Sequence, residues 1–238
     1  MQLFVDSAVE GWLLLSSGAV DVWTIVVTSI RVSGAATAIS LLMGIPLGVL
    51  LGTRRFKGRR FMLLIANTGM GLPPVVVGLI VAMMLSRRGP FGALGLLYSQ
   101  SAMVIAQLVI ALPLITAVTA ASVSAVPRQL RLQARSLGAS RLQEALLVVK
   151  EARMGVIAAV AAGFGSIISE VGAVMMVGGN IAGDTRVMTT AIVQYTRMGN
   201  YGPALALGVT LLGMIALVNV ALLAAQTSAE RFEHQGRT

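Results

Sequence analysis

The chain has 238 residues, of which 56% are hydrophobic and only 11% are charged, and its mean hydropathy is +0.86. Because a soluble globular domain carries about 25% charged residues, this composition excludes a water-soluble fold and indicates a membrane protein with several spans. A net charge of +9 would suggest nucleic-acid binding in a soluble protein, but in a membrane protein it first indicates basic cytoplasmic loops. The lack of cysteine excludes disulfides and thiolate metal sites, and the single His234 argues against histidine catalysis or metal binding.

An apolar patch at 4–15 comes first and contains Asp6 and Glu10, so we expect an interfacial helix there rather than a span. Five longer stretches follow, and each reaches the length of about 20 mainly apolar residues that a spanning helix needs. The predicted spans are 23–51, 61–85, 102–126, 154–177 and 204–225. They predict an all-α membrane protein that forms a single domain over residues 1–238.

The basic residues gather in the connections between these spans. Five lie at 54–60, six at 128–153 and two in the C-terminal tail, so thirteen of the 18 lysines and arginines fall on one side of the membrane. By the positive-inside rule this side is cytoplasmic. We therefore expect the N-terminus outside and the C-terminus inside.

Small residues recur at every fourth position in two of the predicted spans, a spacing that lets membrane helices pack closely. They are Gly44, Gly48 and Gly52 in the first span, and Gly155, Ala159 and Gly163 in the fourth. Pro46, Pro73 and Pro74 lie in or near apolar stretches and predict kinks or breaks in the helices.

The connection at 127–153 is too long for a turn and too polar to span. Residues 129–137 and a segment from Arg141 onward both have helical patterns, and Gly138 is a suitable C-cap between them. The pattern predicts two short helices hinged at 138–140. Such a pair could rest on anionic lipid or could dock a soluble partner.

The residues from Leu132 to Ser140 resemble the coupling-loop motif of ABC importer permeases. Ala134 and Gly138 match the motif, whereas Leu132 and Gln133 depart from its Glu-Ala start. The resemblance implies that this loop contacts an ATPase subunit. The coupling residues it implies are Leu132, Gln133, Ala134, Arg135, Leu137, Gly138, Ala139 and Ser140.

Three further blocks, at 72–78, 168–181 and 185–192, are similar to molybdate and tungstate permeases. Molybdate permeases usually carry Gly-Glu-Phe-Gly-Ala where this chain has Ser-Glu-Val-Gly-Ala, and they keep a Leu-Pro pair where this chain has Lys150-Glu151. The chain is thus identified as a member of the molybdate/tungstate permease family, closest to the tungstate-uptake permeases.

This resemblance implies a five-span permease fold with a cytoplasmic coupling helix, in the cytoplasmic (inner) membrane of a bacterium or archaeon. It implies an ATP-driven oxyanion importer, for tungstate first, with molybdate or sulfate as alternatives. Its expected partners are two ABC ATPase subunits and an extracytoplasmic tungstate-binding protein. Because one chain with five spans is too thin to enclose a pathway, we also expect a homodimer with the route on its two-fold axis. No cofactor or nucleic acid is implied.

The chain itself is not expected to be an enzyme. It has no phosphate-binding loop of the Gly-x-x-x-x-Gly-Lys-Ser/Thr type, so ATP hydrolysis is assigned to a separate subunit. A transporter that works without an ATPase would need several intramembrane acids, and a membrane enzyme would need a catalytic cluster. Glu170 is the one acid deep in a predicted span, which disfavours the first alternative, and with one histidine and no cysteine the cluster that the second needs is missing.

An intramembrane carboxylate such as Glu170 is costly, and it is a functional candidate by default. Because it would repel a dianion, we expect a gate or a helix tie bonded to amides near Gly172 or to an arginine, with a purely structural tie as the alternative. Neutral donors would face the anion instead, and Asn67 and Thr68 are two of them. A helix is also expected within 186–195. The predicted gate and pathway residues are Pro73, Pro74, Ser166, Ser169, Glu170, Gly172, Asn180, Thr189 and Thr190.

Overall fold

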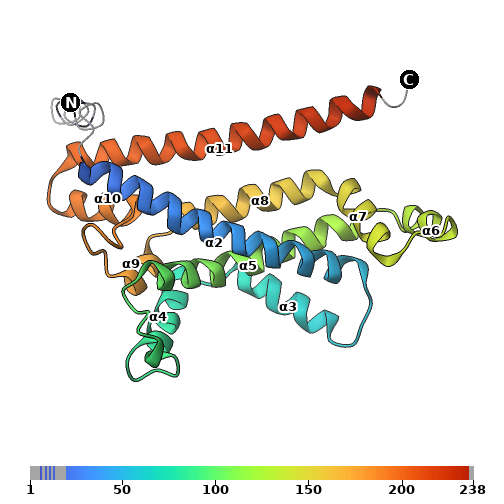
Figure 1. Cartoon of the computed structure of the whole chain (residues 1–238), viewed down its shortest axis with the longest axis horizontal. Coiled ribbons are helices and arrows are strands. Elements are labelled where there is room, and N and C mark those ends of the chain that lie inside the picture. The colour runs from blue at the N-terminus through green and yellow to red at the C-terminus, as the bar shows by residue number, and fades with distance from the viewer. Residues whose placement is uncertain (1–5, 7–8, 10, 12, 14–19, 236–238) are drawn as a thin grey trace. The chain divides into compact units, whose positions relative to one another are not determined.

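The computed structural model describes residues 6, 9, 11, 13 and 20–235. Most of the interfacial helix expected at 4–15 lies outside these residues. The described part of the chain is helical and contains no strand (Figure 1). Its elements are α2 (Val20–Thr53), α3 (Arg59–Met70), α4 (Pro74–Leu85), the 3-10 turn η1 (Gly92–Leu94), α5 (Gln100–Ser124), α6 (Arg128–Ser136), α7 (Arg141–Glu151), α8 (Arg153–Ile168), α9 (Gly172–Gly178), α10 (Met188–Arg197) and α11 (Tyr201–Gln235).

Three of these helices are long and apolar enough to cross a membrane, namely Val22–Thr53, Gln100–Ser124 and Tyr201–Ala224. Two bent pairs, α3 with α4 and α8 with α9, raise the number of spans to as many as five if each pair is one span. The all-α membrane fold expected from the hydropathy is therefore confirmed. The second and fourth predicted spans, however, are each interrupted.

The first interruption follows from proline. Pro73 and Pro74 have no amide hydrogen to donate, and a residue that precedes proline is pushed out of the helical region. Accordingly α3 ends at Met70, and Pro74 starts α4 as its first residue. Pro46, by contrast, lies inside the continuous α2.

The contacts divide the chain into two compact units. The first holds the described residues of Met1–Ala36, Pro73–Val109 and Gly165–Val218, and the second holds those of Thr37–Leu72, Ile110–Phe164 and Asn219–Thr238. The single domain expected over 1–238 stays a prediction.

In the first unit, α4 packs along α9, as Figure 1 also shows. A side chain at Gly78 would place its Cβ 2.6 Å from the backbone of Ala173, so the two helices approach almost to backbone contact. A separate apolar cluster joins the start of α2 to α10 and α11. Its buried members are Val22, Ile25, Val26, Met188, Ala191 and Leu207.

In the second unit, the glycines at the end of α2 pack against α5. A Cβ at Gly44, Gly48 or Gly52 would lie 2.8, 2.5 or 2.7 Å from Ile115, Thr119 or Val123, respectively. In α8, Gly155 faces Ser122 and Gly163 faces Ile115, while Ala159 is fully buried. The close helix packing predicted from the spacing of small residues is confirmed.

Candidate functional site

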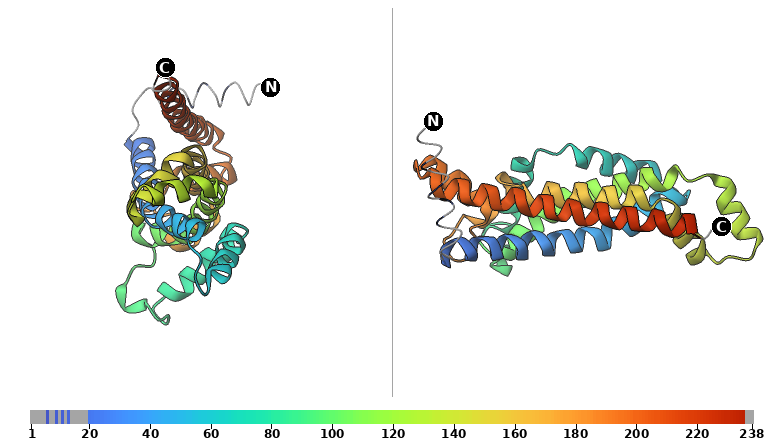
Figure 2. Two further views of the ribbon diagram at one scale, coloured as in Figure 1. Left: turned by 90° about the vertical axis from the view of Figure 1, so that its right-hand side faces the viewer. Right: turned by 90° about the horizontal axis from the view of Figure 1, so that it is seen from above.

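The connection between α5 and α8 forms two short helices, α6 and α7, which Figure 2 shows from two further directions. Gly138 adopts a left-handed backbone with φ +83°, and the amides of Gly138 and Ala139 donate to carbonyls of the last turn of α6 at 3.0 Å. Ser140 then caps α7 in a reciprocal pair with Gln143. The two helices predicted from the pattern, and their hinge at 138–140, are confirmed.

An ion pair holds the two helices together. The guanidinium of Arg135 donates from Nε to Glu144 Oε2 at 2.9 Å and from Nη2 to Oε1 at 3.1 Å. The side chain of Glu144 is 5% exposed, whereas that of Arg135 is 53% exposed. Such a bidentate pair fixes both distance and orientation, so α6 and α7 are joined as one rigid hairpin.

The face of α7 that packs inward differs from the face with the clearest apolar pattern. Leu142, Leu146 and Val149 fall on one helical stripe, yet Glu144 and Val148 are the buried residues. Val148 joins Val123 of α5 and Val126, which follows the end of that helix, in a small core. The apolar periodicity of α7 did not predict that Glu144 is buried, because the burial depends on its ion pair with Arg135, which lies on α6 on the other side of the hinge.

The leucines of the hairpin face outward as a result. The exposed fractions of Leu137 and Leu142 are 88% and 70%, and Leu132 and Leu146 are half or more exposed. Exposed large apolar side chains on a rigid hairpin are typical of a docking surface. The remaining predicted coupling residues, Gln133, Ala134 and Ala139, lie on or beside α6 and are at least partly exposed.

In the first unit, Glu170 lies in the break between α8 and α9. Its Oε1 accepts a hydrogen bond of 2.9 Å from the amide of Ala173, which lies in the first turn of α9. Its backbone carbonyl accepts a bond of 2.8 Å from the hydroxyl of Thr189 in α10. The carboxylate therefore contacts an amide near Gly172, one of the two tie partners expected, and no ion pair involves it within 20–235.

Several other predicted pathway residues adjoin this break. Gly172 packs against Val75, the residue after Pro74, so the start of α4 lies beside the start of α9. Pro73 is the N-cap of α4. Ser169 is exposed and donates to the Gly165 carbonyl at 2.6 Å, while Ser166 is half-buried.

The rest of the predicted set lies toward α10, which confirms the helix expected within 186–195. Thr190 is buried and exchanges hydrogen bonds with the backbone of Val187. Asn180 donates to Gln194 at 2.7 Å. Asn67 and Thr68 lie exposed on α3, which belongs to the second unit.

Two polar residues that sequence reasoning missed hold this region together. Gln107 is buried in α5 and donates from Nε2 to the carbonyl of Ile167 at 3.1 Å. The hydroxyl of Thr185 donates to Gly178 O and accepts from Ile181 N, which closes the connection between α9 and α10. A glutamine within an apolar span was the available signal for Gln107, since a buried amide needs partners.

Residues 44–229 match the family model described as the binding-protein-dependent transport system inner membrane component. The chain is 43% identical over 201 residues to a probable anion ABC transporter permease protein of Haloferax volcanii, which covers 82% of this chain and 87% of the relative. It is 40% identical over 213 residues to the tungstate uptake system permease protein TupB of Peptoclostridium acidaminophilum, covering 90% and 93%.

More distant similarities agree with this result. The molybdenum transport system permease protein ModB of Escherichia coli K12 is 29% identical over 178 residues, which cover 71% of this chain and 78% of the relative. A solved structure of the MetNI methionine ABC transporter in an inward facing conformation superposes with a TM-score of 0.71 at 19% identity, covering 92% and 96%, and shows the shared fold. The chain therefore belongs to the family of inner membrane components of binding-protein-dependent transport systems, and it is a permease of the ABC importer class.

Proposed function

We propose that this permease imports tungstate. The observation that carries the proposal is the 40% identity, over 90% of the chain, to a permease named for tungstate uptake. The Ser-Glu-Val-Gly-Ala run at 169–173 and the Lys150-Glu151 pair support the same branch of the family. Molybdate and sulfate are the alternative cargoes, because relatives named for molybdenum transport are also similar, although less so.

The proposed assembly contains two copies of this chain, with the anion moving along their two-fold axis. A single chain with at most five spans is too thin to enclose a pathway, which supports a second copy. Two ATPase subunits on the cytoplasmic side and an extracytoplasmic binding protein complete the importer. The N-terminus lies outside and the C-terminus inside, as the basic connections indicate.

ATP hydrolysis in the separate subunits acts through the hairpin of α6 and α7. The exposed Leu137 and Leu142 contact the ATPase, and the Arg135–Glu144 pair makes the hairpin move as one body. Arg131 extends this link, because its Nη1 donates to the carbonyl of Thr53 at the end of α2 at 3.3 Å. Nucleotide then shifts the population between inward-open and outward-open states.

The region around Glu170 shapes the pathway without binding the cargo directly. A carboxylate repels a dianion, and here it ties the first turn of α9 through Ala173. The hydroxyl hydrogens of Ser169, Thr189 and Thr190 are already donated to backbone carbonyls. Of the predicted donors near Glu170, Ser166 has a hydroxyl without a hydrogen-bond partner among the described residues. We therefore propose that Ser166 contacts the transported anion directly.

The test is uptake by cells whose own copy of the gene is deleted, complemented with this chain. Intracellular tungsten and molybdenum are measured by mass spectrometry, with molybdate or sulfate as competitors. Tungsten should accumulate, and the competitors should reduce its uptake only at large excess. Equal uptake of tungsten and molybdenum would contradict the proposed cargo.

The coupling role is tested in the same cells with Gly138→Glu, which should abolish uptake and leave membrane insertion intact. Gly58→Glu is the matched control, because Gly58 also has a positive φ with open space around it but lies outside the hairpin. Normal uptake and normal ATPase co-purification with Gly138→Glu would rule out docking at this hairpin.

A further inference from the structure

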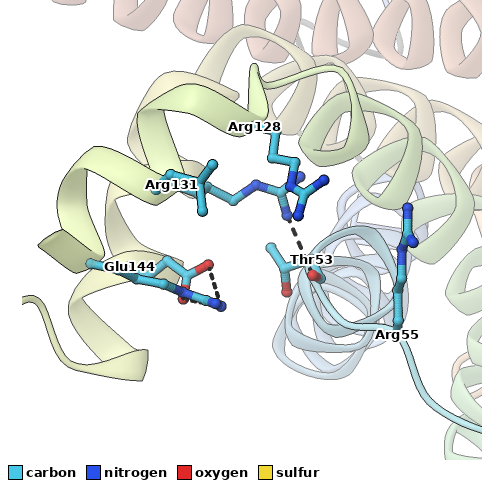
Figure 3. Close-up of a pocket in the computed structure, with 7 residues that line it drawn as sticks. Thr53, Arg55, Arg128, Arg131 and Glu144 are labelled. Atoms are coloured by element: carbon cyan, nitrogen blue, oxygen red, sulfur yellow. Dashed lines mark hydrogen bonds and ion pairs between the residues drawn. The ribbon is translucent and has the colours of Figure 1, made fainter.

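A cavity of about 240 Å³ lies between the end of α2 and the hairpin of α6 and α7, and Figure 3 shows its lining. It belongs entirely to the second unit, and of the exposed leucines of the hairpin only Leu132 is part of its lining. The residues around it are Thr53, Arg55, Arg128, Arg131, Leu132, Arg135 and Glu144.

The lining carries four arginines and one carboxylate. Arg128, Arg131 and Arg135 are spaced at i, i+3 and i+7, so they lie on one face of α6, and Arg55 approaches from the segment after α2. Both carboxylate oxygens of Glu144 already accept from Arg135. The other three guanidinium groups therefore share the cavity without an acidic partner, and their like charges repel one another.

Some of the N–H donors of these arginines also have no hydrogen-bond acceptor among the described residues. Arg131 reaches Thr53 with one nitrogen, but its Nε is buried and has no acceptor. The side chains of Arg55 and Arg128 are exposed and make no hydrogen bond to any described residue, and Figure 3 shows where they lie around the cavity. A buried charged donor without an acceptor is unfavourable, so an acceptor from outside the chain would stabilise the Nε of Arg131.

We propose that this cavity binds a small tetrahedral oxyanion, such as tungstate, sulfate or phosphate. The planar guanidinium presents a fork of donors that matches the oxygen spacing of such anions, and a dianion would offset most of the three unpaired charges. The cavity is smaller than the 300 to 1,000 Å³ or so of pockets that hold drug-sized ligands, which favours a small anion over a nucleotide. The same chemistry fits the phosphate of an anionic lipid headgroup.

A bound anion would bridge two elements. It would join Arg128 and Arg131 of α6 to Arg55 beyond α2, and so restrain the hairpin that is proposed to dock the ATPase. The binding itself rests on this cavity alone and does not depend on the cargo of the transporter.

The test uses the full-length chain in nanodiscs of phosphatidylcholine, titrated separately with tungstate, sulfate and phosphate in a calorimeter at low ionic strength. Arg55→Gln/Arg128→Gln is the variant of choice, because neither side chain has a structural partner and the fold should persist. Its affinity should fall by about tenfold or more, and wild-type affinity should fall as salt is added. Arg131→Gln should lower the affinity as well.

The matched control is Lys57→Gln/Arg141→Gln, which removes the same charge from two nearby exposed residues outside the cavity. Wild-type affinity in this control supports a defined site. An equal loss in both double variants, or unchanged binding in Arg55→Gln/Arg128→Gln, would overturn the proposal.

Nanodiscs that contain phosphatidylglycerol identify the source of the anion. Retained tungstate or phosphate binding assigns the cavity to a soluble oxyanion. Loss of that binding, restored when phosphatidylglycerol is removed, assigns it to a lipid headgroup phosphate.

Discussion

Replacing Arg135 with methionine leaves the carboxylate of Glu144 without its cation. Because that side chain is 5% exposed, water cannot replace the two lost hydrogen bonds easily. Removing one partner of a fully buried pair costs about 3 to 5 kcal/mol, while exposed pairs contribute about 0 to 1 kcal/mol. Since Arg135 is 53% exposed, we discount for solvent and expect a loss of about 2 kcal/mol in the stability of the hairpin.

Replacing the other partner of the pair, Glu144, should destabilise the hairpin less. Glu144→Gln retains one acceptor for Arg135, and the guanidinium can turn toward solvent, so we expect a loss of about 1 kcal/mol or less. This asymmetry follows directly from the unequal burial of the two partners.

Hydrogen exchange at the amides of α6 measures the difference. The helix has nine residues, too few to be stable alone, so its protection reports its attachment to α7. A loss of 2 kcal/mol corresponds to exchange that is faster by about 30-fold, since 1.4 kcal/mol is tenfold. Arg141→Met, on the exposed start of α7, is the control. Equal protection in Arg135→Met and this control, or a larger effect from Glu144→Gln, would refute the reasoning.

Three further predictions concern the two units. Gly48→Ala places a Cβ about 2.5 Å from Thr119, so it should lower the melting temperature in detergent, at a cost of about 1 to 3 kcal/mol in stability. Gly34→Ala, which has open space around its Cβ, should leave the melting temperature unchanged. Equal melting of both variants would contradict the packing of Gly48 against Thr119. Thr185→Val removes the hydroxyl that joins two backbone groups between α9 and α10, and should cost about 2 kcal/mol in thermal unfolding. Thr185→Ser should restore the stability, and failure to do so would point to packing instead. Glu170→Gln keeps an oxygen acceptor for the Ala173 amide but loses charge, so it should change the rate of uptake more than the preference among oxyanions; altered selectivity at an unchanged rate would make Glu170 a ligand.

Local patterns in the sequence predicted much of the fold. Apolar length located the long helices, the four-residue spacing from Gly44 to Gly52 predicted close packing, and Gly138 marked the hinge. Each of these depends on neighbours along one helix or on the conformation of one residue. For that reason they could be found without knowledge of the tertiary structure.

The parts that could not be predicted depend on distant contacts. The break after Ile168 involves Thr189 of α10, which hydrogen-bonds the Glu170 carbonyl from 19 positions away. The inward face of α7 depends on Arg135, which lies beyond the hinge. The cluster of arginines requires Arg55 and α6 to meet, although the i, i+3, i+7 spacing within α6 was visible in the sequence.

The hydrogen bond from Gln107 to the carbonyl of Ile167 has a consequence for how this protein can change. A helix that ends inside a bilayer exposes carbonyls that lipid cannot satisfy, and each costs several kcal/mol. The carbonyl of Ile167 already accepts from the amide of Glu170 at 3.2 Å, and Gln107 adds a second donor from a neighbouring helix, so it helps the break between α8 and α9 to persist. Replacing Gln107 with leucine should therefore weaken the support of that break, although the hydrogen bonds of Glu170 with Ala173 and Thr189 would remain. We expect the glutamine and the break to be kept or lost together among related chains.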